Sequence, residues 1–491
     1  MNEFYGIDLG TTNSCIATID EDDQVMVVTN FEGQLTTPSV VAYDDNNVPY
    51  VGAAAKANLG NAPERTVAFI KREMSNDNYS QRIDGININP IDLSSLILKK
   101  LVDDANQKRV DEEGKEPINR VVITVPAYFG NAERERTIEA GKRAGLEVIS
   151  LINEPTAAAL FFGKKNKQNR TVMVYDLGGG TFDVSIMRIE NGIMDTLATN
   201  GNHHLGGVDW DESFVNFVLL KEGFSENCKQ LPPQEQGALL LAAEDAKKIL
   251  STKESTTVRF AYKGIHNVEI TQKEFEELTE DLVKQTEQLV DAALEMAENP
   301  HIDDVLLVGG SSRMPMIKTF VEKKFNISAK VFEPDLAVAK GAALFAAQEA
   351  SDKGYVKGAI QLGNDKGAAS YGMEIMDQDG VPIVVNLIKM SDDLIIKKEF
   401  SDFFTYENGQ SGIRLAIYEN RVNEDVCEMA KAGEPLEEHV LEWGYPVPQG
   451  TPMRLIIERD KTGVIKVKAG AVGHEINFTI NTKGIAIKKH S

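Results

Sequence analysis

The chain has few cysteines, a deficit of basic residues and no long apolar run. Its 491 residues include three cysteines, Cys15, Cys228 and Cys427, which form no CxxC pair. Widely spaced cysteines in odd number argue against a disulfide framework or a zinc site and favour a reducing compartment. No apolar stretch approaches the ~20 residues of a membrane helix, and the N-terminal residues lack the pattern of a signal peptide. We therefore expect a cytoplasmic protein.

Acidic residues outnumber basic ones, 75 against 52, which gives a net charge of −23. Nucleic acids and anionic membranes attract basic surfaces, so neither is an expected partner. Hydrophobic residues make up 42% of the chain, as in an ordinary globular protein. The length predicts about three or four folding units.

The pattern of elements changes near residue 352. Before it, apolar strand-like runs alternate with amphipathic helices, which predicts an α/β architecture. Predicted strands cover 4–9, 15–19, 25–28, 39–43, 120–129, 146–152, 171–176, 184–189 and 304–310, and predicted helices cover 91–108, 131–145, 153–160, 235–251, 271–298, 314–325 and 337–350. Afterwards, alternating runs separated by turn signals predict a compact antiparallel β domain. We expect domains at 1–351 and 366–491, with a linker rich in Gly, Lys and Asp at 352–365.

Two strand–turn–strand motifs share one pattern. DLGTTNS starts at Asp8 and DLGGGTFD starts at Asp176, 168 residues later. Each has an Asp at the end of an apolar strand, then Leu-Gly, then Thr. This weak internal symmetry suggests a duplicated lobe, because solenoid repeats have periods of only ~20–50 residues.

The two turns suit phosphate binding. Glycine lets the backbone approach a phosphate and aim N–H groups at it, and Thr11, Thr12 and Thr181 add hydroxyl donors. Neither turn matches a P-loop or a dinucleotide-binding fingerprint. Asp8 and Asp176 at the strand ends suit a hydrated magnesium ion. The alternative is a pair of tight hairpins capped by aspartates, and recurrence in a duplicated frame favours phosphate binding over it.

Three further features are weaker. VGGSSRMP (308–315) is a glycine turn that opens a helix, which suits an anion or a plain strand–helix connection. In NEPTAAAL, Asn153 is the expected N-cap, and Glu154 either complements the helix dipole or is catalytic. Lys71 follows no motif and would ordinarily be a solvated lysine.

Taken together, the motifs resemble the seventy-kilodalton heat-shock (Hsp70) chaperone family. They are GIDLGTTNSCIA, TTPSVVAY, AFIKRE, VITVPAYF, AGLEVISLINEPTAAAL, YDLGGGTFDVSI, HLGGVDWD, VLLVGGSSRMPM and FEPDLAVAKGAAL, in the family's order over nearly all of residues 1–350. The resemblance implies an actin/hexokinase-like ATPase with two lobes of duplicated α/β subdomains, ATP in the cleft between them, and weak intrinsic turnover.

The resemblance also implies roles for individual residues. The expected catalytic residues are Lys71, Glu154, Asp176, Thr181 and Asp183, and the expected magnesium site is Asp8, with Asp176 and Glu154 acting through water. The expected ATP/ADP contacts are Asp8, Gly10, Thr11, Thr12, Asn13, Gly178, Gly179, Gly180, Thr181, Gly206, Gly207, Glu244, Lys247, Lys248, Ser251, Gly309, Gly310, Ser311, Arg313 and Asp335.

After residue 350 the chain still resembles the family's peptide-binding β-sandwich, through SYGMEIM, ENGQSGIRLAIYEN and PQGTPMRLIIERDKTGVIKVKA. Such a domain grips extended, unfolded polypeptide segments through backbone hydrogen bonds and an apolar pocket. Met373, Met376, Ile413 and Leu415 fall at the pocket positions. The alternative is that these four are plain core residues.

The chain departs from the family in two places. The family's acidic, leucine-rich linker is replaced by AIQLGND, which puts ATP control of the β domain in doubt. The chain ends at Ser491, where the family continues into a helical lid, so we expect either a β domain that acts without a lid or a sequence that is a piece of a longer protein. The family also implies a J-domain co-chaperone and a nucleotide-exchange factor.

Three other functions remain open. They are a specialised chaperone-like ATPase with uncoupled domains, a small-molecule kinase of the same fold, and a filament-forming ATPase. The β domain and the absence of an acceptor motif argue against the last two. ATPase rates with and without unfolded peptide would separate these alternatives.

Overall fold

The computed structural model describes residues 4–20, 23–112, 114–166, 168–350, 360–367, 369–377, 380–460, 462–471 and 476–479. The chain divides into two compact units. The first contains Met1–Ala127 and Thr137–Gly363, and the second contains Tyr128–Arg136 and Asn364–Ser491. Of the linker expected at 352–365, residues 352–359 lie outside the described part of the chain.

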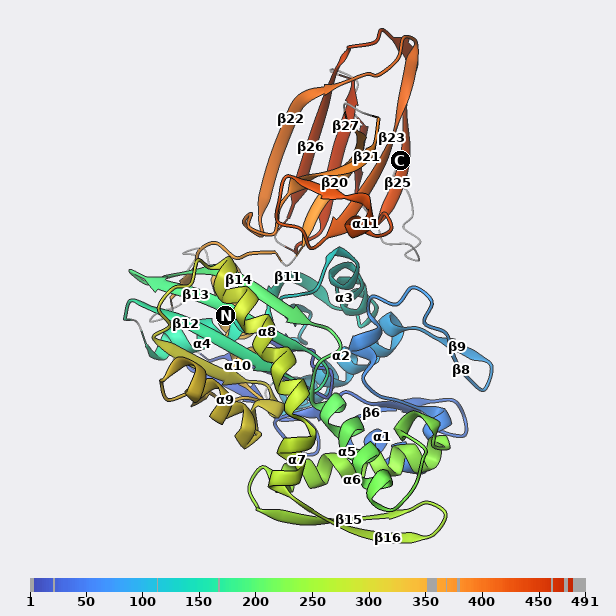
Figure 1. Cartoon of the computed structure of the whole chain (residues 1–491), viewed down its shortest axis with the longest axis vertical. Helices are drawn as coiled ribbons and strands as arrows, with labels where there is room; N and C mark the ends of the chain where they lie inside the picture. The colour runs from blue at the N-terminus through green and yellow to red at the C-terminus, as the bar shows by residue number, and fades with distance from the viewer. Residues whose placement is uncertain are drawn as a thin grey trace. The chain divides into compact units, whose positions relative to one another are not determined.

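Two mixed sheets of the first unit repeat one strand order. Strands β12, β13 and β14 of the second sheet are labelled in Figure 1. In the first sheet the order is β11-β10-β1-β2-β3, and in the second it is β18-β17-β12-β13-β14-β19. Each begins with parallel strands and continues through two antiparallel hairpins. The first sheet contains β1 (Tyr5–Asp8), β2 (Asn13–Ile19), β3 (Val25–Val28), β4 (Thr37–Pro38), β10 (Arg120–Val125) and β11 (Glu147–Asn153), and the second contains β12 (Arg170–Leu177), β13 (Phe182–Glu190), β14 (Ile193–Asn202), β17 (Asp304–Val308), β18 (Lys330–Val331) and β19 (Gln361–Leu362).

Smaller elements complete the part of the chain before residue 351. The small strands are β5 (Val41–Tyr43), β6 (Pro49–Val51), β7 (Thr66–Val67), β8 (Gln81–Ile83), β9 (Ile86–Ile88), β15 (Ser255–Ala261) and β16 (Ile265–Thr271). The helices are α1 (Ala53–Ala57), α2 (Pro90–Asn106), α3 (Asn131–Arg143), α4 (Glu154–Lys165), α5 (Gly207–Lys221), α6 (Pro233–Leu250), α7 (Gln272–Leu278), α8 (Glu280–Met296), α9 (Pro315–Phe325) and α10 (Ala337–Ala350), with short 3-10 helices η3 (Ile70–Glu73) and η6 (Gly310–Arg313).

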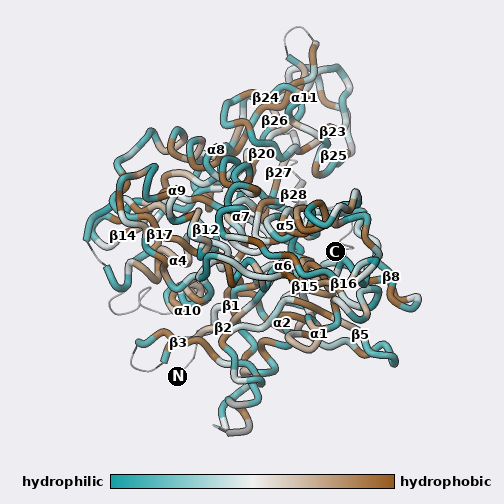
Figure 2. Tube along the Cα trace, turned by 60° about the horizontal axis from the view of Figure 1, so that its bottom comes forward, coloured by the Kyte–Doolittle hydropathy of each residue, from teal (hydrophilic) through white to brown (hydrophobic). Residues whose placement is uncertain are grey.

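Helices α4 and α10 form a core with both sheets. One buried cluster joins Ala17 and Val122 of the first sheet, Val174 of the second, and the alanine-rich faces of the two helices. In the Cα trace of Figure 2, parts of α4 and α10 have the brown colour of hydrophobic residues. The helices meet so closely that a Cβ on Gly341 would lie 1.7 Å from the Ala157 carbonyl oxygen. Only glycine fits there, so the small residues fix how the two sheets are held together.

A second core covers the other face of the second sheet. It combines strand residues such as Tyr175 and Ile186 with α5, α6, α8 and the β15–β16 hairpin. This hairpin was not predicted from the sequence. The single helix expected over 271–298 is wrong, because Thr279, with φ −106° and ψ 11°, separates α7 from α8.

The second unit is rich in antiparallel strands, as the alternating runs predicted. Its strands are β20 (Ser370–Met376), β21 (Pro382–Ile388), β22 (Ile396–Phe404), β23 (Gln410–Asn420), β24 (Val426–Glu428), β25 (Glu437–Val447), β26 (Pro452–Arg459), β27 (Ile465–Ala471) and β28 (Ile476–Thr479), with one short helix, α11 (Met429–Ala432). They form sheets of order β24-β21-β20-β23-β25 and β22-β26-β27-β28. Inner residues of both sheets share one core, including Leu415 and Ile457. The alternating runs did not predict strands β20, β22, β24 and β25.

Among the described residues, no helix combines the length and the apolar character needed to cross a membrane.

Candidate functional site

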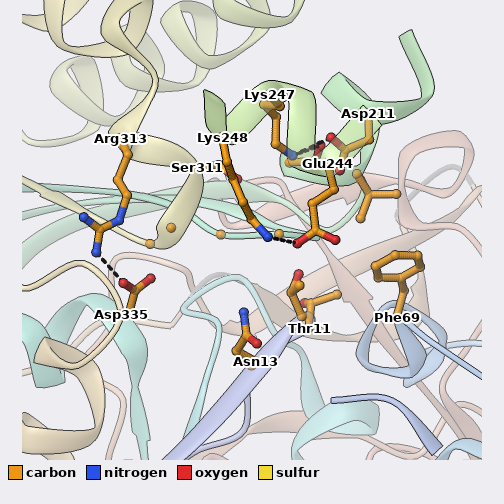
Figure 3. A pocket seen from close by; sticks show the side chains of 18 of the residues that line it. Thr11, Asn13, Phe69, Asp211, Glu244, Lys247, Lys248, Ser311, Arg313 and Asp335 are labelled. Carbon is orange, nitrogen blue, oxygen red and sulfur yellow. Dashed lines mark hydrogen bonds and ion pairs between the residues drawn. The ribbon is translucent and has the colours of Figure 1, made fainter. Parts of the chain in front are cut away.

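A cavity of about 640 Å³ opens in the first unit, at the ends of both β-hairpins (Figure 3). Most residues expected to contact nucleotide line it: Asp8, Gly10, Thr11, Thr12, Asn13, Lys71, Glu154, Asp176, Gly178, Gly179, Thr181, Gly207, Glu244, Lys247, Lys248, Ser251, Gly309, Gly310, Ser311, Arg313 and Asp335. Gly180, Gly206 and Asp183 do not line it. Asp183 is buried opposite Asp176 in the β12–β13 ladder.

The first turn, residues 9–12, joins β1 to β2 and is held from outside by two serines. Ser39 donates its hydroxyl to the Gly10 carbonyl at 2.8 Å, and its N–H to the Thr12 carbonyl at 2.8 Å. The Gly10 N–H donates to the Ser14 hydroxyl at 3.1 Å. The turn is therefore rigid before any ligand arrives, as an anion-binding loop has to be.

The second turn, residues 178–181, joins β12 to β13 and is held by the start of α5. The N–H groups of Gly207 and Val208 donate to the carbonyls of Gly178 and Gly179 at 3.0 and 2.8 Å. The antiparallel pairing on both sides confirms that both motifs are turns between strands.

The two turns touch each other. A Cβ on Gly179 would lie 1.6 Å from the Thr12 hydroxyl oxygen, and a Cβ on Gly180 would lie 2.3 Å from Thr11 Cγ2. The glycines are thus needed for the close approach of the two turns. The buried Thr12 hydroxyl oxygen has no hydrogen-bond partner among the described residues. A phosphate oxygen would be a suitable partner for this unpaired hydroxyl.

Carboxylates gather beside the turns. Burial, together with the charge of Glu154, raises the pKa of Asp8 to about 7, and Lys71 and the Thr124 hydroxyl partly oppose this shift. Burial and the neighbouring charges of Glu154, Asp183 and Asp8 raise the pKa of Asp176 well above its ordinary value. So much buried negative charge favours a nearby cation.

This charge fits a hydrated divalent ion better than a caged one. No three Asp, Glu, His or Cys side chains in the described ranges are grouped closely enough to hold a metal by themselves. Magnesium usually keeps several waters and takes one or two carboxylates plus phosphate oxygens. Asp8 and Asp176, beside turns that suit phosphate, match that requirement.

Lys71 is the main residue that motif reasoning alone missed. It lies on η3, is buried, and forms an ion pair with Glu154. Glu154 begins α4, as expected, but Asn153 makes no side-chain capping bond to that helix. A buried lysine paired with a buried glutamate at a cavity wall is not a solvated lysine. Only tertiary structure brings them together, because they are 83 residues apart.

Charged pairs also line the cavity (Figure 3). Glu244 of α6 binds Lys248 at 2.7 Å and, across the cavity, Lys56 of α1 at 2.7 Å. Although burial opposes it, these lysines lower the pKa of Glu244 to about 2. Lys247 pairs with Asp211 at 2.7 Å, and Arg313 pairs with Asp335. Neither Lys56 nor Asp211 was expected at the site from the sequence, although Asp211 ends the motif HLGGVDWD.

The Lys56–Glu244 pair ties two walls of the cavity, so Lys56→Ala should speed ligand release. A partly buried pair of this kind contributes about 1 kcal/mol, which corresponds to roughly five-fold in the dissociation rate. Stopped-flow release of a fluorescent nucleotide measures it. Lys99→Ala, which removes an exposed pair on α2, is the matched control and should leave release unchanged. Equal release rates for both variants would contradict the prediction.

The four residues expected to form a peptide pocket are not gathered at one surface. Met373 and Leu415 are buried in the core of the second unit, and Ile413 packs against it. Met376 is 60% exposed. The burial of Met373 and Leu415 therefore matches the alternative, that they are core residues.

The stretch AIQLGND begins as part of the first unit. Gln361 and Leu362 form β19, which pairs in parallel with Ile193 and Met194 of β14. Ile360 is buried and packs into the cluster between the sheets, and its carbonyl accepts a hydrogen bond from Gln348 at 2.7 Å. Gly363 donates its N–H to the Met194 carbonyl at 2.8 Å.

Comparison with known proteins gives one consistent result. The family model described as "Hsp70 protein" matches residues 4–85 and 74–489. The chaperone proteins DnaK of Thermotoga petrophila and Thermotoga maritima are each 38% identical over 489 residues, covering 95% of this chain and 78% of the relative. DnaK of Thermosipho melanesiensis is 39% identical over 483 residues, with the same coverage.

Proposed function

Because the chain belongs to the Hsp70 family and is an Hsp70-type, ATP-dependent chaperone and ATPase, we propose that it binds and hydrolyses magnesium ATP in the 640 Å³ cavity. The observation that carries this proposal is the meeting of two rigid glycine turns above a buried carboxylate cluster. The repeated strand order of the two sheets supports an actin-like ATPase with duplicated lobes.

In this proposal, one group of residues binds the phosphates and another surrounds the adenosine. The turns offer N–H groups and the hydroxyls of Thr11, Thr12 and Thr181 to the phosphates. The charged groups farther along, Glu244, Lys247, Lys248, Ser251, Arg313 and Asp335, with Gly309, Gly310 and Ser311, would surround the adenosine. Magnesium, when bound by Asp8 and through water by Asp176 and Glu154, would neutralise phosphate charge.

Hydrolysis would then depend on positioning. Lys71 brings a positive charge to the phosphates and holds Glu154 in place. Glu154, Asp176 and Thr181 line the cavity together, where they can orient an attacking water, and Asp183 supports Asp176 from the adjacent strand. Phosphoryl transfer needs little covalent chemistry from the protein beyond such positioning and charge stabilisation.

The second unit would be the peptide-binding β-sandwich, with extended apolar segments of client polypeptides as its ligands. A J-domain co-chaperone and a nucleotide-exchange factor would be its further partners. The docked strand β19 supports coupling between the units: although the linker sequence is unusual, its backbone pairs with β14. This is the reading we favour over uncoupled domains.

Peptide-stimulated ATP hydrolysis tests the function and the coupling together. We expect an unfolded apolar peptide to raise the ATPase rate several-fold. In Leu362→Asp, whose charge would disrupt the packing of β19, basal hydrolysis should remain and the stimulation should be lost. Ile265→Asp, at an exposed position of β16, is the matched control and should behave like the unchanged protein.

Other outcomes have clear meanings. Indifference of the unchanged protein to peptide would contradict coupling. Phosphorylation of sugars would favour a kinase, and concentration-dependent sedimentation would favour a filament.

A further inference from the structure

Three consecutive carbonyl groups of the second turn are tied from outside the turn. Those of Gly178 and Gly179 accept the N–H groups of Gly207 and Val208. That of Gly180 accepts Nε of Arg72 at 2.8 Å. Two ties therefore come from the backbone of α5, which belongs with the second sheet, and the third comes from a side chain of the distant η3 segment.

These ties orient the opposite side of the turn. In a planar trans peptide, the carbonyl and the following N–H point in opposite directions. Fixing the carbonyls of residues 178–180 therefore aims the N–H groups of Gly179, Gly180 and Thr181 away from α5 and Arg72. None of these N–H groups donates to an acceptor within the described ranges. The hydrogen bond from Arg72 to the Gly180 carbonyl therefore sets the direction of the Thr181 N–H.

Arg72 is itself firmly held. Its guanidinium grips the carboxylate of Asp209, with one contact at 3.4 Å and a closer one. Asp209 accepts the Gly206 N–H at 2.7 Å, so the same carboxylate also fixes the entry to α5. The Arg72 side chain is only 12% exposed. The guanidinium binds the Asp209 carboxylate with two of its nitrogens and the Gly180 carbonyl with the third. A lysine ammonium cannot make this planar arrangement of contacts.

The position of Arg72 in the chain links two parts of the site. It directly follows Lys71, which pairs with Glu154. Phe69, just before them, has a left-handed φ of 60°, which is uncommon for an aromatic residue and shows that the backbone is constrained there. If η3 moves away, Lys71 and the Thr181 peptide lose their alignment together.

We infer that Arg72 is a positioning residue for ATP hydrolysis, which orients the Gly180–Thr181 peptide only when η3 is seated against the second turn. This inference rests on the proposed nucleotide site. Hydrolysis should then depend on the position of η3 more strongly than nucleotide binding does. The hydrogen bonds from α5 to the second turn, together with the first turn, still hold the ligand when η3 moves.

The test separates chemistry from binding. Arg72→Ala should lower the single-turnover hydrolysis rate by about 10- to 100-fold, while the Kd for ATP changes by less than about three-fold. Arg72→Lys, which can keep one contact but not all, should fall between. Arg82→Ala, an exposed arginine on β8, removes the same charge and should have no effect. Equal losses in rate and affinity, or an unchanged rate, would overturn the inference.

A double-mutant cycle tests the route through Asp209. Asp209→Asn keeps an acceptor for the Gly206 N–H but weakens the grip on Arg72. The double variant Arg72→Ala/Asp209→Asn should be no slower than Arg72→Ala, because both act through one contact. Additive losses would refute this route.

Two controls keep the outcomes distinct. Lys71→Met serves as the benchmark: if it hydrolyses ATP normally, the nucleotide site itself is misassigned, whereas an inactive Lys71→Met beside a normal Arg72→Ala refutes only the role of Arg72. Thermal unfolding of the ligand-free variants checks folding, and Arg72→Lys carries the test if Arg72→Ala is unfolded.

Discussion

Replacing Lys71 with methionine should lower the rate of ATP hydrolysis by about 100-fold or more, while ATP still binds. In the proposed site the charge of Lys71 would lie where negative charge is transferred, and removing one such preorganised group costs roughly 10²–10³ in rate. In the proposed site most of the phosphate contacts would come from the two turns, which the substitution leaves intact. Single-turnover hydrolysis and equilibrium binding of a fluorescent ATP analogue would measure the two quantities separately.

The ion pair with Glu154 calls for a control. Both side chains are buried, so Lys71→Met leaves a carboxylate without its partner, which can cost about 3–5 kcal/mol of stability. The double variant Lys71→Met/Glu154→Gln removes both charges. We expect it to recover thermal stability but to remain inactive. Hydrolysis near the normal rate in either folded variant would exclude the assigned role.

Gly309→Ala should have the largest effect on stability. Gly309 has φ +79°, and a Cβ there would lie 2.4 Å from the Leu177 carbonyl oxygen and 2.6 Å from Asp176 Oδ1. The left-handed conformation costs an alanine about 1–2 kcal/mol, and overpacking against fixed backbone adds roughly 1–3 kcal/mol. Because β12 must shift, Asp176 and the second turn should move too, and ATP affinity should fall by more than about ten-fold.

The neighbouring glycine supplies a matched comparison. A Cβ on Gly310 meets only Asp335 Oδ1, at 3.2 Å, which is the end of a side chain that can rotate. Gly310→Ala should therefore lower the thermal unfolding midpoint far less than Gly309→Ala. Similar midpoints for the two variants would show that the turn at Gly309 is not constrained as the structure indicates.

Local patterns in the sequence predicted much of the fold. The alternation of strands and helices, the two hairpin turns and the antiparallel character of the C-terminal unit follow from hydrophobic periodicity and turn residues, which are local signals. The same signals misjudged residues 255–298. There the β15–β16 hairpin is stabilised by packing on α6. The helix break at Thr279 could not be predicted because no glycine or proline marks it.

The sequence by itself determined that two turns of one pattern, suited to phosphate, recur between strands, and family motifs added Lys71 and the adenosine residues as expectations. Only tertiary structure decided which side chains meet. It paired Lys71 with Glu154, brought Lys56 to Glu244, seated Leu362 on β14, and tied Arg72 to Gly180. The reason is physical: a turn is specified by the conformations of adjacent residues, whereas an ion pair across a cavity depends on how distant segments pack.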